Sequence, residues 1–98
     1  AIDWIYDNIG VDAFKNVKPT DDGSIKYKKS YQPTLIESLL IAVCIINEKK
    51  QFKRKINYRN ELDKLLKEDY FQDLLGKNTM NLENIAVRID KIIRIFGE

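Results

Sequence analysis

Residues 79–97, TMNLENIAVRIDKIIRIFG, decide the fold of this chain. Their apolar residues recur at steps of three, one, three, three, one and three, which is the stripe of an amphipathic helix seated on a core. The stripe consists of Leu82, Ile85, Ala86, Ile89, Ile92, Ile93 and Phe96. The opposite, solvent-facing side is expected to carry Glu83, Arg88, Asp90, Lys91 and Arg94. Thr79 or Asn81 can cap the start of this helix, and Gly97 can end it.

Other segments with helical periodicity are separated by turn-forming residues. We expect helices over 2–9, 35–47, 58–69 and 70–75, and a further turn or two of helix over 11–17. Gly10 and Gly76 stand where helices end, and residues 18–24 have turn chemistry throughout. Tyr70, Phe71, Leu74 and Leu75 are expected to point inward. The pattern predicts an all-α bundle of five or six helices, with residues 25–31 as loop.

The run Leu39 to Ile46 is apolar on every side, so periodicity alone does not distinguish a buried helix from a buried strand. Its β-branched residues favour a strand. The start signals before it favour a helix, because Thr34 and Glu37 have capping-box spacing and Pro33 suits a first helical position. We therefore predict a central helix wrapped by the others, with Ile41 and Ile45 nearly fully buried.

Composition indicates one small domain. The chain has 98 residues, of which 44% are apolar and 33% charged, enough for a core and a soluble exterior. It opens Ala-Ile-Asp-Trp, already in helical pattern, so residues 1–98 are expected to be a fragment of a longer protein. Cys44 lies in the most apolar run and is expected to be a buried thiol, which suits a reducing cytoplasm. An eight-residue apolar run is far short of the roughly 20 residues that a membrane span needs.

Catalytic signals are weak. The chain has no histidine, which removes the usual general base and the commonest zinc ligand, and its four glycines are scattered singly rather than in a phosphate loop. Pro19 and Asp21, followed by Glu48 and Lys50, loosely mimic a nuclease signature. Such a site needs adjacent strands, whereas these residues fall in a turn and at a helix end. We predict no catalytic residue, no metal site and no cofactor.

Two basic segments are the candidate nucleic-acid contacts. They leave the rest of the chain, with nine cations and 15 acids, at a net charge of −6. Cations neutralise phosphates, and an aromatic side chain can stack on an unpaired base. The alternative is a pair of solvated connectors, with the aromatic tucked into the core. The candidate residues are Lys26, Lys28, Lys29, Lys49, Lys50, Phe52, Lys53, Arg54 and Lys55.

Trp4 is the only tryptophan, and the sequence leaves open core packing or contact with a domain outside this chain. Tyr27, Tyr31 and Tyr58 lie beside the loops, where polar-tipped aromatics mostly form the edge of a core and sometimes an interface.

Three pieces of the chain carry a resemblance to a known family. They are Ile2 to Tyr6 through Gly10 with Ala13-Phe14, the apolar run Leu35 to Val43, and Tyr70-Phe71 followed by Asn78-Thr79 and Val87-Arg88-Ile89. Together they resemble the helical C-terminal region of a prokaryotic family with a ParB/sulfiredoxin-like N-terminal domain, which includes restriction proteins of the GmrSD type. The family's Asp-Gly-Gln-Gln-Arg loop and His-Asn-His module do not occur here. The resemblance implies a DNA-related or phage-defence context and carries over no catalytic residue.

These observations favour a non-catalytic accessory domain that interacts with other domains of its parent chain, with no membrane contact. The alternative is a nucleic-acid-binding domain that uses the basic segments 26–29 and 49–55. The sequence does not identify the specific partner or the oligomeric state.

Overall fold

The helices form over segments of apolar periodicity that lie between turn-forming residues. The computed structural model describes residues 1–18, 20, 22–77 and 79–98. Within them the order is α1 (Ile2–Asn8), α2 (Pro33–Lys49), α3 (Tyr58–Leu66), α4 (Asp69–Gly76) and α5 (Leu82–Phe96). These described residues form no strand, only two isolated bridges, Val17 with Tyr27 and Phe52 with Gly97. The prediction of an all-α bundle is confirmed.

The helix starts follow the capping signals of the sequence. Pro33 is the first residue of α2 and Gln32 is its N-cap. Of the two predicted starts, α2 therefore uses the proline at its first position and not a capping box formed by Thr34 and Glu37. Thr34 instead donates its hydroxyl to the Leu75 carbonyl of α4, 2.9 Å away. Asn81 caps α5 by accepting the backbone N–H groups of the next turn. The Asn81 cap satisfies backbone donors that have no partner inside the helix, whereas Gln32 makes no side-chain capping bond.

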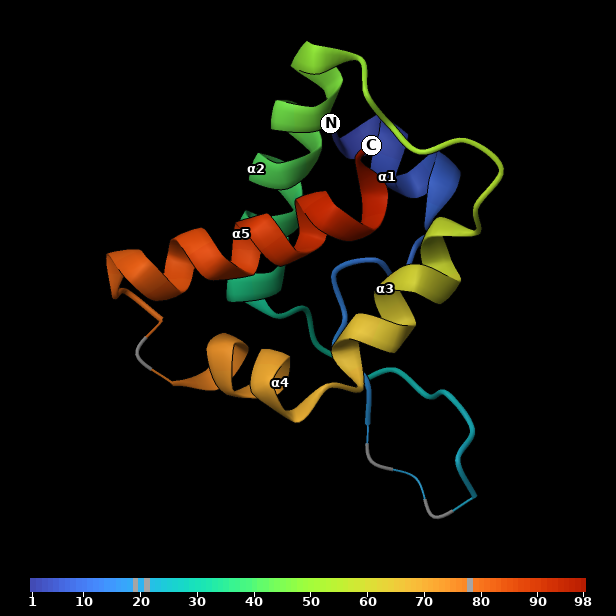
Figure 1. The fold of residues 1–98 in the computed structure, drawn as a ribbon. Helices are drawn as coiled ribbons and strands as arrows, with labels where there is room; N and C mark the ends of the chain where they lie inside the picture. Colours follow the sequence, from blue (N-terminus) through green and yellow to red (C-terminus); the bar gives the residue numbers. More distant parts are fainter. Residues whose placement is uncertain (19, 21, 78) are drawn as a thin grey trace.

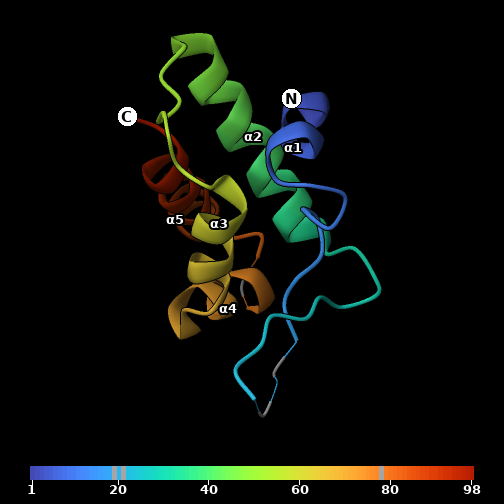
Figure 2. The ribbon, with the colours of Figure 1, turned by 90° about the vertical axis from the view of Figure 1, so that its right-hand side faces the viewer.

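The core lies where α5 crosses α2 (Figure 1). α4 lies below this crossing, and α3 lies beside the C-terminal half of α5. α1 approaches from the other side of the molecule, as Figure 2 shows. The fully buried apolar side chains come from all five helices and include Ile5, Leu35, Leu39, Ala42, Val43, Leu62, Leu66, Phe71, Ile92 and Phe96.

The stripe predicted on α5 is wrong at three positions. Leu82 and Ala86, expected in the core, are exposed, Leu82 by 82%, and Arg88, expected in solvent, is only 1% exposed. Leu82 stands in the first turn of α5, where no other helix covers it. Arg88 lies four residues before the buried Ile92, on the side of α5 that faces α2 and α4. Hydrogen-bond acceptors on the neighbouring elements therefore decide the burial of Arg88, and the periodicity of the sequence does not reveal them.

The predicted burial of α2 is also only partly right. Ile41 is 37% exposed, Ile45 is half-buried and Cys44 is exposed, against the expectation that all three are buried. Glu37, Ile41, Cys44 and Glu48 follow one another at steps of four, three and four, so they share one face of the helix. The described elements leave that face open to solvent. α2 is central but not wrapped on every side.

Smaller differences concern the helix boundaries. Residues 11–15 form turns and a bend rather than α-helix, and Val11 is 75% exposed. Gly10 has φ +111°, a conformation that interrupts α-helix. The helix expected over 58–69 ends at Leu66, and α4 begins at Asp69. Tyr70 points outward, 56% exposed, and the ammonium group of Lys91 lies 5.2 Å from its ring centre. The loop expected over 25–31 is confirmed, apart from its bridge at Tyr27.

Candidate functional site

The two basic segments lie at opposite ends of the molecule. Residues 26–29 belong to the loop that precedes α2, and residues 49–55 follow its other end (Figures 1 and 2). The 17 residues of α2 separate them, which corresponds to about 25 Å at 1.5 Å per residue. The structure therefore does not bring the eight cations into one patch.

The second basic segment is partly used in folding. The Phe52 ring stacks on Trp4 with 4.3 Å between centroids, and the Lys53 ammonium donates to the Arg94 carbonyl at 2.8 Å. The backbone N–H of Lys53 also donates to the Phe96 carbonyl at 2.7 Å. Phe52 thus follows the core alternative rather than base stacking, and Trp4 packs within this chain. The segment's exposed cations are Lys49, Lys50, Arg54 and Lys55.

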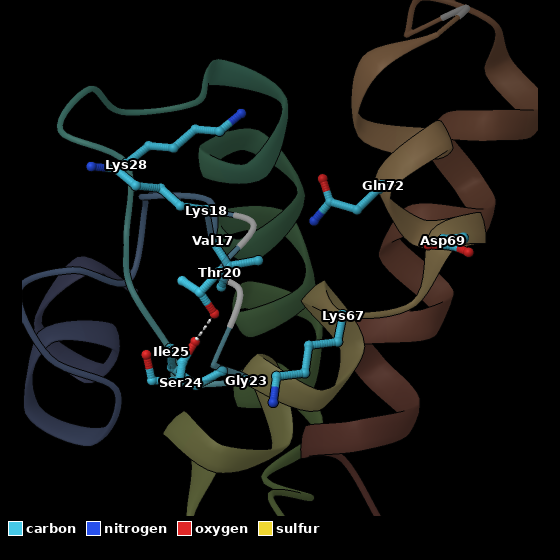
Figure 3. A pocket seen from close by; sticks show the side chains of 10 residues that line it. All are labelled: Val17, Lys18, Thr20, Gly23, Ser24, Ile25, Lys28, Lys67, Asp69 and Gln72. Atoms are coloured by element: carbon cyan, nitrogen blue, oxygen red, sulfur yellow. Dashed lines mark hydrogen bonds between the residues drawn. The ribbon is translucent and has the colours of Figure 1, made fainter.

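The first basic segment borders a pocket of about 480 Å³ between the 17–28 loop and the start of α4 (Figure 3). Lys18, Lys28 and Lys67 contribute to its lining. Their ammonium groups end in three separate places in Figure 3, and Asp69 adds a carboxylate to the rim. A phosphate site needs donors that converge on one anion. This pocket lacks that geometry and is a weak candidate.

A buried polar cluster fixes the loop beside this pocket. The Asn16 carboxamide donates to the side-chain oxygens of Gln32 at 3.0 Å and Gln72 at 2.8 Å. Gln72 donates back to Asn16 at 2.8 Å and to the Leu66 carbonyl at 2.6 Å. Because these amides satisfy one another, the cluster is explained by its role in holding the loop against α4.

A second polar cluster attaches the loop to α3. The Tyr27 hydroxyl donates to the Asp63 carboxylate at 3.1 Å, and the Arg59 guanidinium donates to the same carboxylate. Arg59 also lies over the Tyr27 ring, 4.5 Å from its centre. Burial raises the pKa of the Tyr27 hydroxyl to about 12; the charge of Asp63 adds to this rise and that of Arg59 opposes it. At neutral pH the tyrosine donates to Asp63, whereas the buried Nη1 of Arg59 has no hydrogen-bond partner among the described residues.

Arg88 is the most deeply buried cation among the described residues. Its guanidinium donates to the Ser38 hydroxyl at 3.1 Å, the Leu74 carbonyl at 3.1 Å and the Thr79 carbonyl at 3.2 Å. No ion pair joins it to a carboxylate within the described part of the chain. The Leu74 carbonyl lies in the last turn of α4, where helix carbonyls lack an internal partner and carry partial negative charge. Arg88 therefore joins α2, α4 and α5.

The remaining metal candidates do not assemble. Pro19 and Asp21 lie outside the described residues, and Glu48 and Lys50 stand exposed at the end of α2. The described residues contain no group of three potential metal-ligating side chains. The Asp22 carboxylate accepts from Ser24 instead, which lowers the pKa of Asp22.

An apolar surface at the crossing of α2 and α5 is the strongest candidate site, and sequence periodicity misplaced it in the core. On α5, residues 82, 86, 89 and 93 follow one another at steps of four, three and four and share one flank. The opposite flank carries Lys91, paired with Glu68 beside α4 at 3.7 Å. This apolar flank therefore faces away from α4, toward the second half of α2. There Ile41 and Ile45 stand three and seven residues after Ser38, the hydrogen-bond partner of Arg88.

We call this surface the α2–α5 apolar face. Its members are either exposed or only half-buried: Ile41, Ile45, Leu82, Ala86, Ile89 and Ile93. Contiguous apolar patches on a soluble domain mark docking surfaces more often than scattered single residues do. The sequence did contain a signal for this face. The apolar residues of α5 cover a wider arc of the helix surface than contact with a single core requires.

Two further observations bear on function. None of the helices within the described residues combines the length and the apolarity needed to traverse a bilayer. Comparison with known proteins found no matching family model, no similar curated protein and no similar solved structure.

Proposed function

We propose that this chain is a non-catalytic interaction domain, whose α2–α5 apolar face docks another protein or another domain of its parent chain. The observation that carries the proposal is the exposure of Leu82 on α5 and of Ile41 on α2, two helices in contact, each with exposed or half-buried apolar neighbours at helical spacing. Exposing large apolar side chains has no benefit for a domain that acts alone, since burying each contributes about 1.5–3 kcal/mol. The absence of histidine from the sequence supports a non-catalytic role. The wider DNA-related context rests on the family resemblance of the sequence.

Site-specific photocrosslinking tests the docking face. We expect a benzophenone amino acid in place of Leu82 to give discrete protein adducts in cells that express the chain. Placement at Tyr31, which is 57% exposed but lies in the loop before α2, is the control. Ile41→Glu should remove the Leu82 adducts without unfolding the domain, because Ile41 already contacts solvent. Equal adducts from both positions, or adducts that survive Ile41→Glu, would contradict the proposal.

Nucleic-acid binding through the basic segments is the second proposal, favoured by the exposure of Arg54 and Lys55 next to Lys49 and Lys50. Replacing Arg54 and Lys55 together by Ser tests it, and Lys53 is left intact because its ammonium group helps to hold the C-terminus. If both cations touched phosphates, the salt dependence of DNA affinity would fall by about two logarithmic units of slope. If the basic segments are instead solvated connectors, the DNA affinity and the free energy of unfolding should both stay unchanged, because exposed charges contribute little to folding.

A further inference from the structure

The outer edges of the α2–α5 apolar face are acidic on both helices. On α5, Asp90 and Glu83 stand four residues after and three before Ala86, at the solvent side of the apolar flank. On α2, Glu37 and Glu48 stand four residues before and seven after Ile41. Residues at these spacings lie on one face of a helix. The apolar band is thus bordered by two carboxylates along each helix, and all four are exposed.

The cations near this border lie at one end, where α2 and α5 both finish. Arg94 pairs with Asp90 at 2.6 Å, Lys49 and Lys50 end α2, and the Lys53 ammonium donates to the Arg94 carbonyl. Glu37, Glu48 and Glu83 form no ion pair within the described part of the chain. Away from these cations the border carries the exposed Glu37 and Glu83 carboxylates and is acidic, although the chain as a whole has a net charge of +2.

From this charge pattern we infer that the occupant of the α2–α5 apolar face is a basic amphipathic helix, with an apolar stripe flanked by lysine or arginine. This inference rests on the proposed docking function and specifies its partner. An apolar stripe at positions i, i+3, i+4 and i+7 suits a band formed by two crossing helices. Flanking cations would meet the carboxylates on both edges, which gives specificity and faster association. A second copy of this chain would instead bring two acidic borders together.

Binding of designed peptides tests the inference. The probe is an 18-residue, fluorescein-labelled helix with a leucine and alanine stripe flanked by lysine, and its matched forms carry glutamine or glutamate in place of lysine. Fluorescence anisotropy at about 50 mM salt should show the lysine form binding at least tenfold more tightly than the glutamine form, because several exposed ion pairs add together. At about 500 mM salt most of this difference should disappear.

Matched variants locate the contact. Leu82→Gln should weaken the lysine peptide about tenfold and Asp90→Asn about threefold. Asp73→Asn is the control, because Asp73 forms a similar exposed ion pair four residues from its partner, but on α4. Equal binding of the glutamine and lysine forms would overturn the basic-helix inference while leaving docking at this face intact. Binding that ignores Leu82→Gln, or no binding at all, would overturn it as well. A dimer in sedimentation velocity that Leu82→Gln dissociates would make a second copy the occupant.

Discussion

Replacing Arg88 with methionine is the most informative perturbation of this fold. Methionine keeps the unbranched apolar stem and removes the guanidinium that donates to the Leu74 and Thr79 carbonyls. The Ser38 hydroxyl keeps a partner after the change, since it also donates to the Thr34 carbonyl at 2.7 Å. The substitution therefore leaves two acceptors of the α4–α5 connection without their donor.

Two effects oppose each other in this variant. Each buried acceptor left without a donor costs about 1–3 kcal/mol, so the two together cost about 2–6 kcal/mol. Removing a buried charge recovers part of its desolvation penalty, which amounts to several kcal/mol for an ion with no counter-charge. For Arg88 that penalty is already reduced by the negative end of α4, worth up to about 2 kcal/mol in buried geometries. We expect the lost hydrogen bonds to dominate, with a net loss of about 2–4 kcal/mol in the free energy of unfolding.

Urea unfolding followed by far-ultraviolet circular dichroism measures the effect. Arg94→Met is the matched control, because Arg94 lies on the same helix, is exposed and pairs only with Asp90. Such a pair contributes about 0.3–0.5 kcal/mol. Ser38→Ala should cost about 1 kcal/mol and provides a milder readout if Arg88→Met does not fold. A stability of Arg88→Met equal to or above that of the unchanged chain would refute the reasoning, because the buried cation would then be a net cost.

Three other outcomes are expected. Ile92→Ala should cost about 2–5 kcal/mol through a cavity, whereas Ile41→Ala should cost less than about 1 kcal/mol, both measured by urea unfolding. Cys44 should react with Ellman's reagent in the folded state within minutes, which a buried thiol would not do. The folded pKa of Tyr27, about 12, exceeds the unfolded value of 10.0. The stability it contributes is therefore complete below pH 10 and lost between pH 10 and 12, so the stability difference from Tyr27→Phe should shrink over that range.

Periodicity and capping residues predict most of the helical structure. The α5 helix, its Asn81 cap, the proline start of α2 and the fold class all follow from local rules, because a helix with one apolar side is stable only against a core. The boundary between α3 and α4 did not follow. Lys67 and Glu68 are compatible with a continuous helix, and the break is stabilised by Gln72, which donates to the Leu66 carbonyl across it. Gln72 and Leu66 come close together only because the helix breaks between them, so the sequence alone does not predict their contact.

The candidate site was the part least accessible to sequence reasoning. Apolar residues at helical spacing predict a buried stripe, but they do not say how far the neighbouring helices extend to cover it. On α5 the uncovered part is the first turn with Leu82, and on α2 it is the face with Ile41 and Cys44. The burial of Arg88 could not be predicted either. A charged residue is expected in solvent unless the acceptors that bind it inside the protein are known.

The buried Arg88 and the exposed Leu82 and Ala86 lie on different flanks of α5, which indicates separate roles for the two flanks. The flank with Arg88 and Lys91 is bonded to α2 and to the α3–α4 region, and it holds the bundle together. The flank with Leu82 and Ala86 contributes little to the core and would be neutral to stability if it were polar. Exposed substitutions there should change the free energy of unfolding by less than about 0.5 kcal/mol. Stability alone therefore gives no reason for that flank to be apolar, whereas a docked partner does.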